Sequence, residues 1–154
     1  MKRLVRRQAQ AKLAELSPLT SRLFTGRGIV DIREADHRLQ GLLPPDGLKG
    51  LDAASDLLAS AVKTDKRILV IGDFDADGAT SCVLLVHGLK ALGATHVDYL
   101  VPNRFEFGYG LTPEIVAVAA RFQPDLLITV DNGISSIDGV AAAKRQGYQV
   151  LISD

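Results

Sequence analysis

The sequence is poor in several residue types, and each shortage excludes a class of protein. Of its 154 residues, one is cysteine and none is tryptophan. Because the lone Cys82 allows no internal disulfide bond, we expect a reducing, cytoplasmic setting. No apolar run approaches the ~18 residues of a membrane span, and the basic N-terminus lacks the apolar stretch of a secretory signal. The formal net charge is zero, so bulk charge by itself predicts no polyanionic partner, and we expect no membrane association.

The residues that are present indicate an α/β fold with two regions. Hydrophobic residues make up 47% of the chain, which is typical of a soluble domain with a real core. Residues 1–50 are irregular, with an N-terminal helix candidate and the turn-rich stretch GLLPPDGLKG, and we predict a helical, wrapping segment there. Residues 51–154 alternate apolar strands with helices of about ten to fifteen residues, a rhythm that predicts a parallel sheet with flanking helices.

Aspartates follow three of the predicted strands. The stretch GDFDADG after the first strand carries Asp73, Asp75 and Asp77, whereas Asp131 follows LLITV and Asp154 follows VLIS. Since the carboxyl ends of parallel strands share one edge of the sheet, we expect all five carboxylates to converge there. Such crowding is unfavourable without a cation, and Mg²⁺ or Mn²⁺ takes oxygen ligands of this kind.

Three other interpretations of the first aspartate cluster account for less of it. A calcium loop of the EF-hand type needs a bidentate glutamate at its twelfth position, where this chain has Leu84, and it follows a helix instead of a strand. A haloacid-dehalogenase phosphatase would need a Ser or Thr after the next strand, and DYLVPN supplies none. Helix capping by Asp77, for a helix that begins near Ala79, explains one aspartate of the three.

Several motifs in order carry a family resemblance. VIGDFDADGATS resembles the first motif of the DHH phosphoesterase superfamily. VPNRFEFGYGL and ITVDNGISS resemble the next motifs of its RecJ branch, the single-strand-specific 5′-to-3′ exonucleases. The resemblance runs from about residue 17 to the last residue and implies a DHH phosphoesterase domain over residues 51–154. VLISD stops at the Asp of the Asp-His-His motif, so we expect an incomplete domain, an N-terminal piece of a longer enzyme, that is inactive alone.

The resemblance also implies a role for each aspartate. Asp75, Asp77 and Asp131 would be the catalytic carboxylates that hold two Mn²⁺ or Mg²⁺ ions. Asp73 would be a further ligand or would orient the others, and Asp154 would mainly support the site. Two such metals can activate water and clamp a phosphate without a side-chain nucleophile. The implied activity is hydrolysis of single-stranded DNA from its 5′ end, in DNA repair and recombination.

Polar and aromatic residues near this edge are candidates for binding nucleic acid. Asn103 and Arg104 begin a loop after the second strand, where an arginine can bind backbone phosphates. Tyr109 can stack on bases, as can the phenylalanines of the same loop, although at least one of these is expected to pack on the core. Thr80 and Ser81 can bind phosphate near a helix start, or simply cap the helix.

Two rival functions use the same surface. One is a DHH-family phosphodiesterase for short oligonucleotides or cyclic dinucleotides, and the long segment before the first motif favours the RecJ branch over it. The other is a non-catalytic fragment that binds nucleic acid or a protein partner. For the exonuclease, the expected partners are single-stranded DNA, a single-strand-binding protein and a helicase, and the expected state is a monomer.

Overall fold

The computed structural model describes residue 5, residues 13–36 and residues 38–154. The N-terminal helix candidate lies in residues outside these ranges. The chain divides into two compact units, Met1–Leu48 and Lys49–Asp154. Among the described residues, no helix combines the length and the apolar character that crossing a membrane requires.

The first unit is helical and irregular, as predicted. Its elements are α1 (Pro18–Thr25) and the short 3₁₀ helices η1 (Ile32–Ala35), η2 (Leu39–Gly41) and η3 (Pro45–Gly47). The hydroxyl of Ser17 accepts a hydrogen bond from the Thr20 N–H at 3.2 Å and so begins α1. Ser21 lies buried in α1, and its hydroxyl accepts a bond of 2.9 Å from the Leu13 N–H. Serine hydroxyls thus cap the start of α1 and join this helix to Leu13.

The second unit is a parallel α/β domain, which confirms the predicted fold class. Its sheet has the strand order β2-β1-β3-β4, and every neighbouring pair is parallel. In chain order, its elements are α2 (Leu51–Lys63), β1 (Ile68–Ile71), α3 (Ala76–Ala91), β2 (Val97–Leu100), α4 (Arg104–Phe107), α5 (Pro113–Ala119), η4 (Ala120–Phe122), β3 (Leu126–Val130), α6 (Ile137–Arg145) and β4 (Gln149–Ser153).

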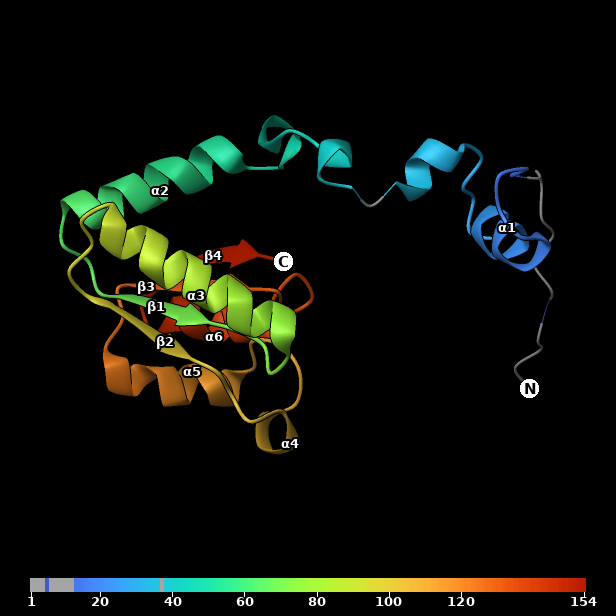
Figure 1. The fold of residues 1–154 in the computed structure, drawn as a ribbon. Coiled ribbons are helices and arrows are strands. Elements are labelled where there is room, and N and C mark those ends of the chain that lie inside the picture. The colour runs from blue at the N-terminus through green and yellow to red at the C-terminus, as the bar shows by residue number, and fades with distance from the viewer. Residues whose placement is uncertain (1–4, 6–12, 37) are drawn as a thin grey trace. The chain divides into compact units, whose positions relative to one another are not determined.

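Helices cover both faces of this sheet (Figure 1). Ile68 and Val70 of β1 face the layer of α2 and α3, whereas Leu69 and Ile71 face α5 and α6. All four side chains of β1 are buried, as are all five of β3. Central strands buried on both faces read as continuous apolar runs, which is why the sequence pattern identified them. Because β1 and β3 are packed on both faces, the residues at their carboxyl ends start from well-fixed positions.

Two local predictions differ from the structure. Helix α3 begins at Ala76 and not near Ala79, and its N-cap is Asp75, so the assignment of the cap to Asp77 is wrong. The loop after β2 contains the single helical turn α4, which begins where the Asn103 side chain accepts a bond from the Phe105 N–H at 3.0 Å. A turn this short depends on its cap instead of on apolar periodicity.

Candidate metal centre

The candidate site lies where β1 and β3 end side by side. Ile71, the last residue of β1, is paired with Thr129 of β3. The chain continues from β1 to the outer strand β2 on one side, and from β3 to β4 on the other. Open α/β sheets bind ligands at such a switch point, because the connections diverge and leave the strand ends accessible.

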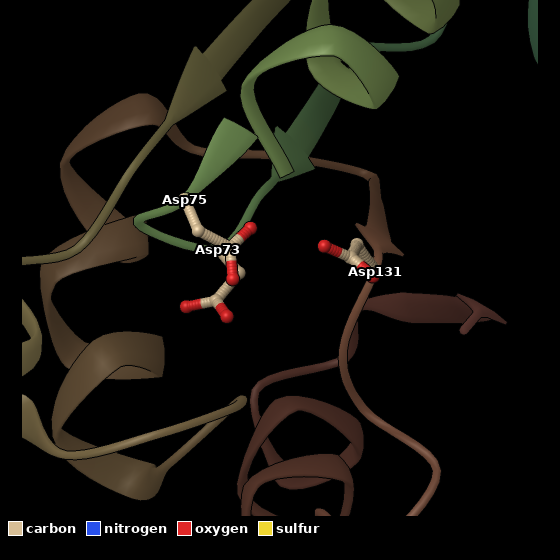
Figure 2. A group of neighbouring side chains, drawn as sticks. All are labelled: Asp73, Asp75 and Asp131. Atoms are coloured by element: carbon tan, nitrogen blue, oxygen red, sulfur yellow. The ribbon is translucent and has the colours of Figure 1, made fainter. Parts of the chain in front are cut away.

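Three aspartates meet at this point. Asp73 and Asp75 lie on the loop after β1, and the side chain of Asp131 faces them from the end of β3 (Figure 2). One carboxylate oxygen from each of the three lies within 4.8 Å of the others. Carboxylate oxygens at this spacing are the donor set that hard divalent cations prefer, so these residues fit the metal that the sequence implies.

A tight backbone turn presents Asp73. Its side chain is 8% exposed, and its carboxylate accepts a bond of 2.7 Å from the Phe74 N–H. The start of α3 packs directly on the main chain of this residue. A Cβ atom at Gly78 would lie 2.4 Å from the carbonyl oxygen of Asp73. Glycine at position 78 is therefore required by this close approach.

Asp75 has a second task at the start of α3. As the N-cap, its carboxylate accepts a bond of 3.1 Å from the Gly78 N–H. This bond is the largest cause that lowers the pKa of Asp75, and the positive charge of Arg104 adds to it. Asp75 therefore remains ionised and keeps a negative charge at the site.

Asp131 is perturbed in the opposite direction. Burial is the main cause that raises its pKa, and repulsion from Asp75, Asp77 and Asp73 adds to it. Its backbone has a φ of 57°, in the left-handed region that residues other than glycine rarely adopt. A cation bound among these carboxylates would offset the part of the rise in the Asp131 pKa that comes from repulsion.

Two of the five predicted carboxylates stand apart from this group. Asp77 lies in the first turn of α3, and its charge acts on Asp131 without joining the three converging oxygens. The carboxylate of Asp154 accepts a bond of 2.9 Å from the Ile134 N–H and so ties the end of β4 to the loop after β3. Metal binding by Asp77 and Asp154 stays a prediction.

Arg104 and Tyr109 form the rim of the site. The guanidinium of Arg104 donates to Asp73, and also to Asp75 at 3.4 Å. It lies 5.4 Å from the centre of the Tyr109 ring. The hydroxyl of Tyr109 donates to the main-chain oxygen of Asp131 at 3.3 Å. The rim thus joins the loop after β2 to both halves of the acidic cluster.

The other predicted nucleic-acid contacts have less direct positions. Asn103 uses its side chain to cap α4, and the Thr80 hydroxyl donates to the Ala76 carbonyl at 2.9 Å within α3. Ser81 is half-buried in α3. Phe107 packs against the core, as expected for one of the loop phenylalanines, whereas Phe105 is 92% exposed. Contacts of these residues with nucleic acid remain a prediction.

Asn132 is a site residue that sequence reasoning missed. It follows Asp131 directly and is 1% exposed. Its amide donates to the Ile71 and Val130 carbonyls at 3.2 and 2.9 Å. An amide residue next to a strand-end aspartate was the available signal, but its burial depends on tertiary structure that the sequence pattern does not show.

Comparisons with known proteins agree with this geometry. Residues 67–154 match the DHH family, N-terminal domain. The chain is 50% identical over 141 residues to the single-stranded-DNA-specific exonuclease RecJ of Salmonella typhimurium, a match that covers 92% of this chain and 24% of that protein. The chain thus spans about a quarter of the length of the curated relatives it matches.

Two crystal structures of RecJ with manganese are also similar. One, of exonuclease RecJ bound to manganese, has a TM-score of 0.64 and 43% identity, covering 73% of this chain and 28% of that one. The other, RecJ from Thermus thermophilus in complex with Mn²⁺, has a TM-score of 0.60 and 35% identity, covering 91% of this chain and 19% of that one.

Proposed function

Since the chain belongs to the DHH family, we propose that the protein hydrolyses phosphodiester bonds of single-stranded DNA from the 5′ end, with Mn²⁺ or Mg²⁺ bound at its acidic cluster. The observation that carries the proposal is the convergence of Asp73, Asp75 and Asp131 at the ends of β1 and β3. Its support beyond the geometry is the similarity to RecJ exonucleases and to RecJ structures with Mn²⁺.

The aspartates would hold the cations and set their position. Bound divalent ions supply Lewis acidity to the scissile phosphate and lower the pKa of an attacking water. Asp75 keeps its charge through the Gly78 N–H bond, so it offers an ionised oxygen. A bound cation would favour the charged form of Asp131 and so oppose the rise in its pKa. We propose Asp77 and Asp154 as further groups around the same centre.

Arg104 and Tyr109 would bind the DNA strand beside the cations. The Arg104 guanidinium, now on Asp73 and Asp75, is placed to bind a phosphate once cations neutralise those carboxylates. Tyr109 is 56% exposed, so part of its ring is available for stacking on a base. Asn103, Thr80 and Ser81 are proposed as weaker contacts near the same edge.

The wider setting is also proposed. We infer a DNA repair and recombination role in the cytoplasm, as a monomer that cooperates with a single-strand-binding protein and a helicase. We also propose that residues 1–50 form a wrapping segment and residues 51–154 the DHH domain, which the two compact units support.

The test is hydrolysis of 5′-labelled single-stranded DNA by the purified full-length protein with Mn²⁺. We expect release of 5′ mononucleotides, loss of release in Asp131→Asn, and normal release in the control Asp98→Asn, which changes an exposed aspartate of β2. Cleavage of dinucleotides or cyclic dinucleotides without cleavage of long strands would favour the phosphodiesterase alternative. DNA binding without cleavage of any substrate would favour the non-catalytic one.

A further inference from the structure

Asn132 joins the two strands that carry the candidate metal ligands. Both hydrogen bonds of its amide group go to main-chain carbonyls, Ile71 at 3.2 Å and Val130 at 2.9 Å. Ile71 is the last residue of β1 and Val130 is the last residue of β3. The side chain therefore bridges the central strands at the point where their regular pairing stops.

Each of these carbonyls lies close to a carboxylate in the chain. Asp131 follows Val130 directly, and Asp73 lies two residues after Ile71. Holding the two carbonyls together fixes the separation of the main-chain segments from which the carboxylates extend. The rigidity of a buried amide with both donors used makes this bridge effective.

The backbone around Asn132 is strained in a way that requires support. Asp131 has a φ of 57° and Gly133 a φ of 119°, so Asn132 lies between two left-handed residues. A residue other than glycine is uncommon in this conformation, and it persists where its surroundings hold it. A Cβ atom at Gly133 would lie 2.5 Å from the Thr129 hydroxyl, so the turn is also packed tightly.

The chemistry of position 132 favours a neutral donor group. The Ile71 and Val130 carbonyl oxygens accept hydrogen bonds from the side chain at this position. An ionised carboxylate or an aliphatic side chain would offer them no donor. The amide oxygen of Asn132 is buried without a hydrogen-bond partner among the described residues. An unpaired buried acceptor costs free energy, so the structure retains this amide in spite of that cost.

We propose that Asn132 is a positioning residue that sets the distance between Asp131 and the Asp73–Asp75 pair, and thereby the affinity of the site for divalent cations. The inference rests on the proposed function, because it takes these carboxylates to be metal ligands. Groups that orient metal ligands typically change metal affinity by about 10- to 100-fold when they are removed. Asn132 is expected to act within that range.

The experiment measures the Kd for Mn²⁺ alone, from the electron paramagnetic resonance signal of free Mn²⁺, on the full-length protein. Asn132→Leu keeps the volume and removes both donors. The matched control is Val116→Ala, which changes a fully buried residue of α5 in the core between α5, α6 and the sheet. All variants are compared well below their melting temperatures, so loss of global stability does not enter the Kd.

We expect Asn132→Leu to bind Mn²⁺ about tenfold more weakly or worse, while Val116→Ala binds like the unaltered protein in spite of its lower melting temperature. A smaller loss in Asn132→Leu, or an equal loss in the control, overturns the inference. If Asn132→Leu does not fold, Asn132→Ser, which keeps one donor, takes its place in the test. Mn²⁺ binding weaker than in the control then supports the inference, and Mn²⁺ binding equal to that of the control overturns it.

A third variant separates the two proposals. Asp131→Asn removes a proposed ligand itself. If Asp131→Asn weakens Mn²⁺ binding and Asn132→Leu does not, the positioning role is wrong and the metal site stands. If neither variant weakens binding, the metal site itself is wrong, and the positioning role falls with it.

Discussion

Arg104 donates from its guanidinium group to the carboxylates of Asp73 and Asp75. The positively charged guanidinium of Arg104, which belongs to the loop after β2, therefore contacts carboxylate oxygens that we propose as metal ligands. The same contact raises the pKa of Arg104, mainly through its bond with Asp73, so the guanidinium remains charged throughout the accessible pH range. Its charge is available either to the aspartates or to a phosphate of a bound strand.

Replacing Arg104 with alanine should weaken the binding of single-stranded DNA. One phosphate contact would be lost, so the slope of log affinity against log salt should decrease by about one unit. The measurement is a fluorescence anisotropy titration of the full-length protein at several salt concentrations. Arg121→Ala, at an exposed position in η4, is the control and should leave the slope unchanged. An unchanged slope in Arg104→Ala would assign the residue a structural role.

Two substitutions at Asp75 should separate its two tasks. Asparagine is also a good N-cap, so Asp75→Asn should keep the start of α3, whereas Asp75→Ala should cost about 1 kcal/mol of unfolding free energy. Both variants should lose hydrolysis by about 100-fold or more, a barrier change of about 2.7 kcal/mol. Denaturant unfolding and the nuclease assay measure the two effects. Substantial activity in Asp75→Asn would remove Asp75 from the proposed ligands.

Asp131→Asn should stabilise the metal-free protein at neutral pH. The folded-state pKa of Asp131 is raised above its ordinary value of 3.8, so the folded state binds this proton more tightly than the unfolded chain does. The stabilisation that the unaltered protein gains from binding this proton is therefore lost as the pH rises from 3.8 through the raised pKa. The variant lacks this titrating group, so it does not undergo this particular loss. Melting temperatures in EDTA should differ at pH 7 and converge below the ordinary pKa. A variant less stable at pH 7 would contradict this.

Two glycines of α3 should respond in opposite directions to alanine. Gly78→Ala places a methyl group 2.4 Å from a main-chain oxygen of Asp73, and we expect a loss of about 1–3 kcal/mol. At Gly88, within the same helix, no atom of the described residues lies within 4 Å of the added carbon, apart from the adjoining residues and the nearby backbone of α3. Alanine at this position should therefore stabilise the fold by about 0.5–1 kcal/mol. Urea unfolding measures both. Equal changes in unfolding free energy at the two positions would show that helix propensity, and not the contact with Asp73, determines the effect of Gly78→Ala.

The alternation of apolar strands and helices was enough to predict the parallel sheet, because β1 and β3 are buried on both faces. Placing Asp131 beside Asp73 required β1 and β3 to be neighbours, which the strand order establishes. The start of α3 was not predicted correctly, since Asp75 and Asp77 are both suitable caps and the choice depends on how the loop packs against Gly78.

Other parts of the site depend on contacts between distant segments. The carboxylate of Asp154 accepts a hydrogen bond from the N–H of Ile134, twenty residues earlier in the chain. No local sequence pattern indicates that bond. The burial of Asn132 arises in the same way, because one of its partners, Ile71, is 61 residues away. Residue type predicted which groups can bind a cation, whereas tertiary structure decides which of them converge.

The left-handed backbone of Asp131 also bears on how this site can change during evolution. The residues that tolerate this conformation best are glycine, asparagine and aspartate. One nucleotide substitution converts an aspartate codon into an asparagine codon or a glycine codon. A single mutation can therefore remove the charge at this position and leave the turn intact. Descendants of such a gene can thus lose the cation binding that we propose for Asp131 and still keep a foldable domain on which selection can act.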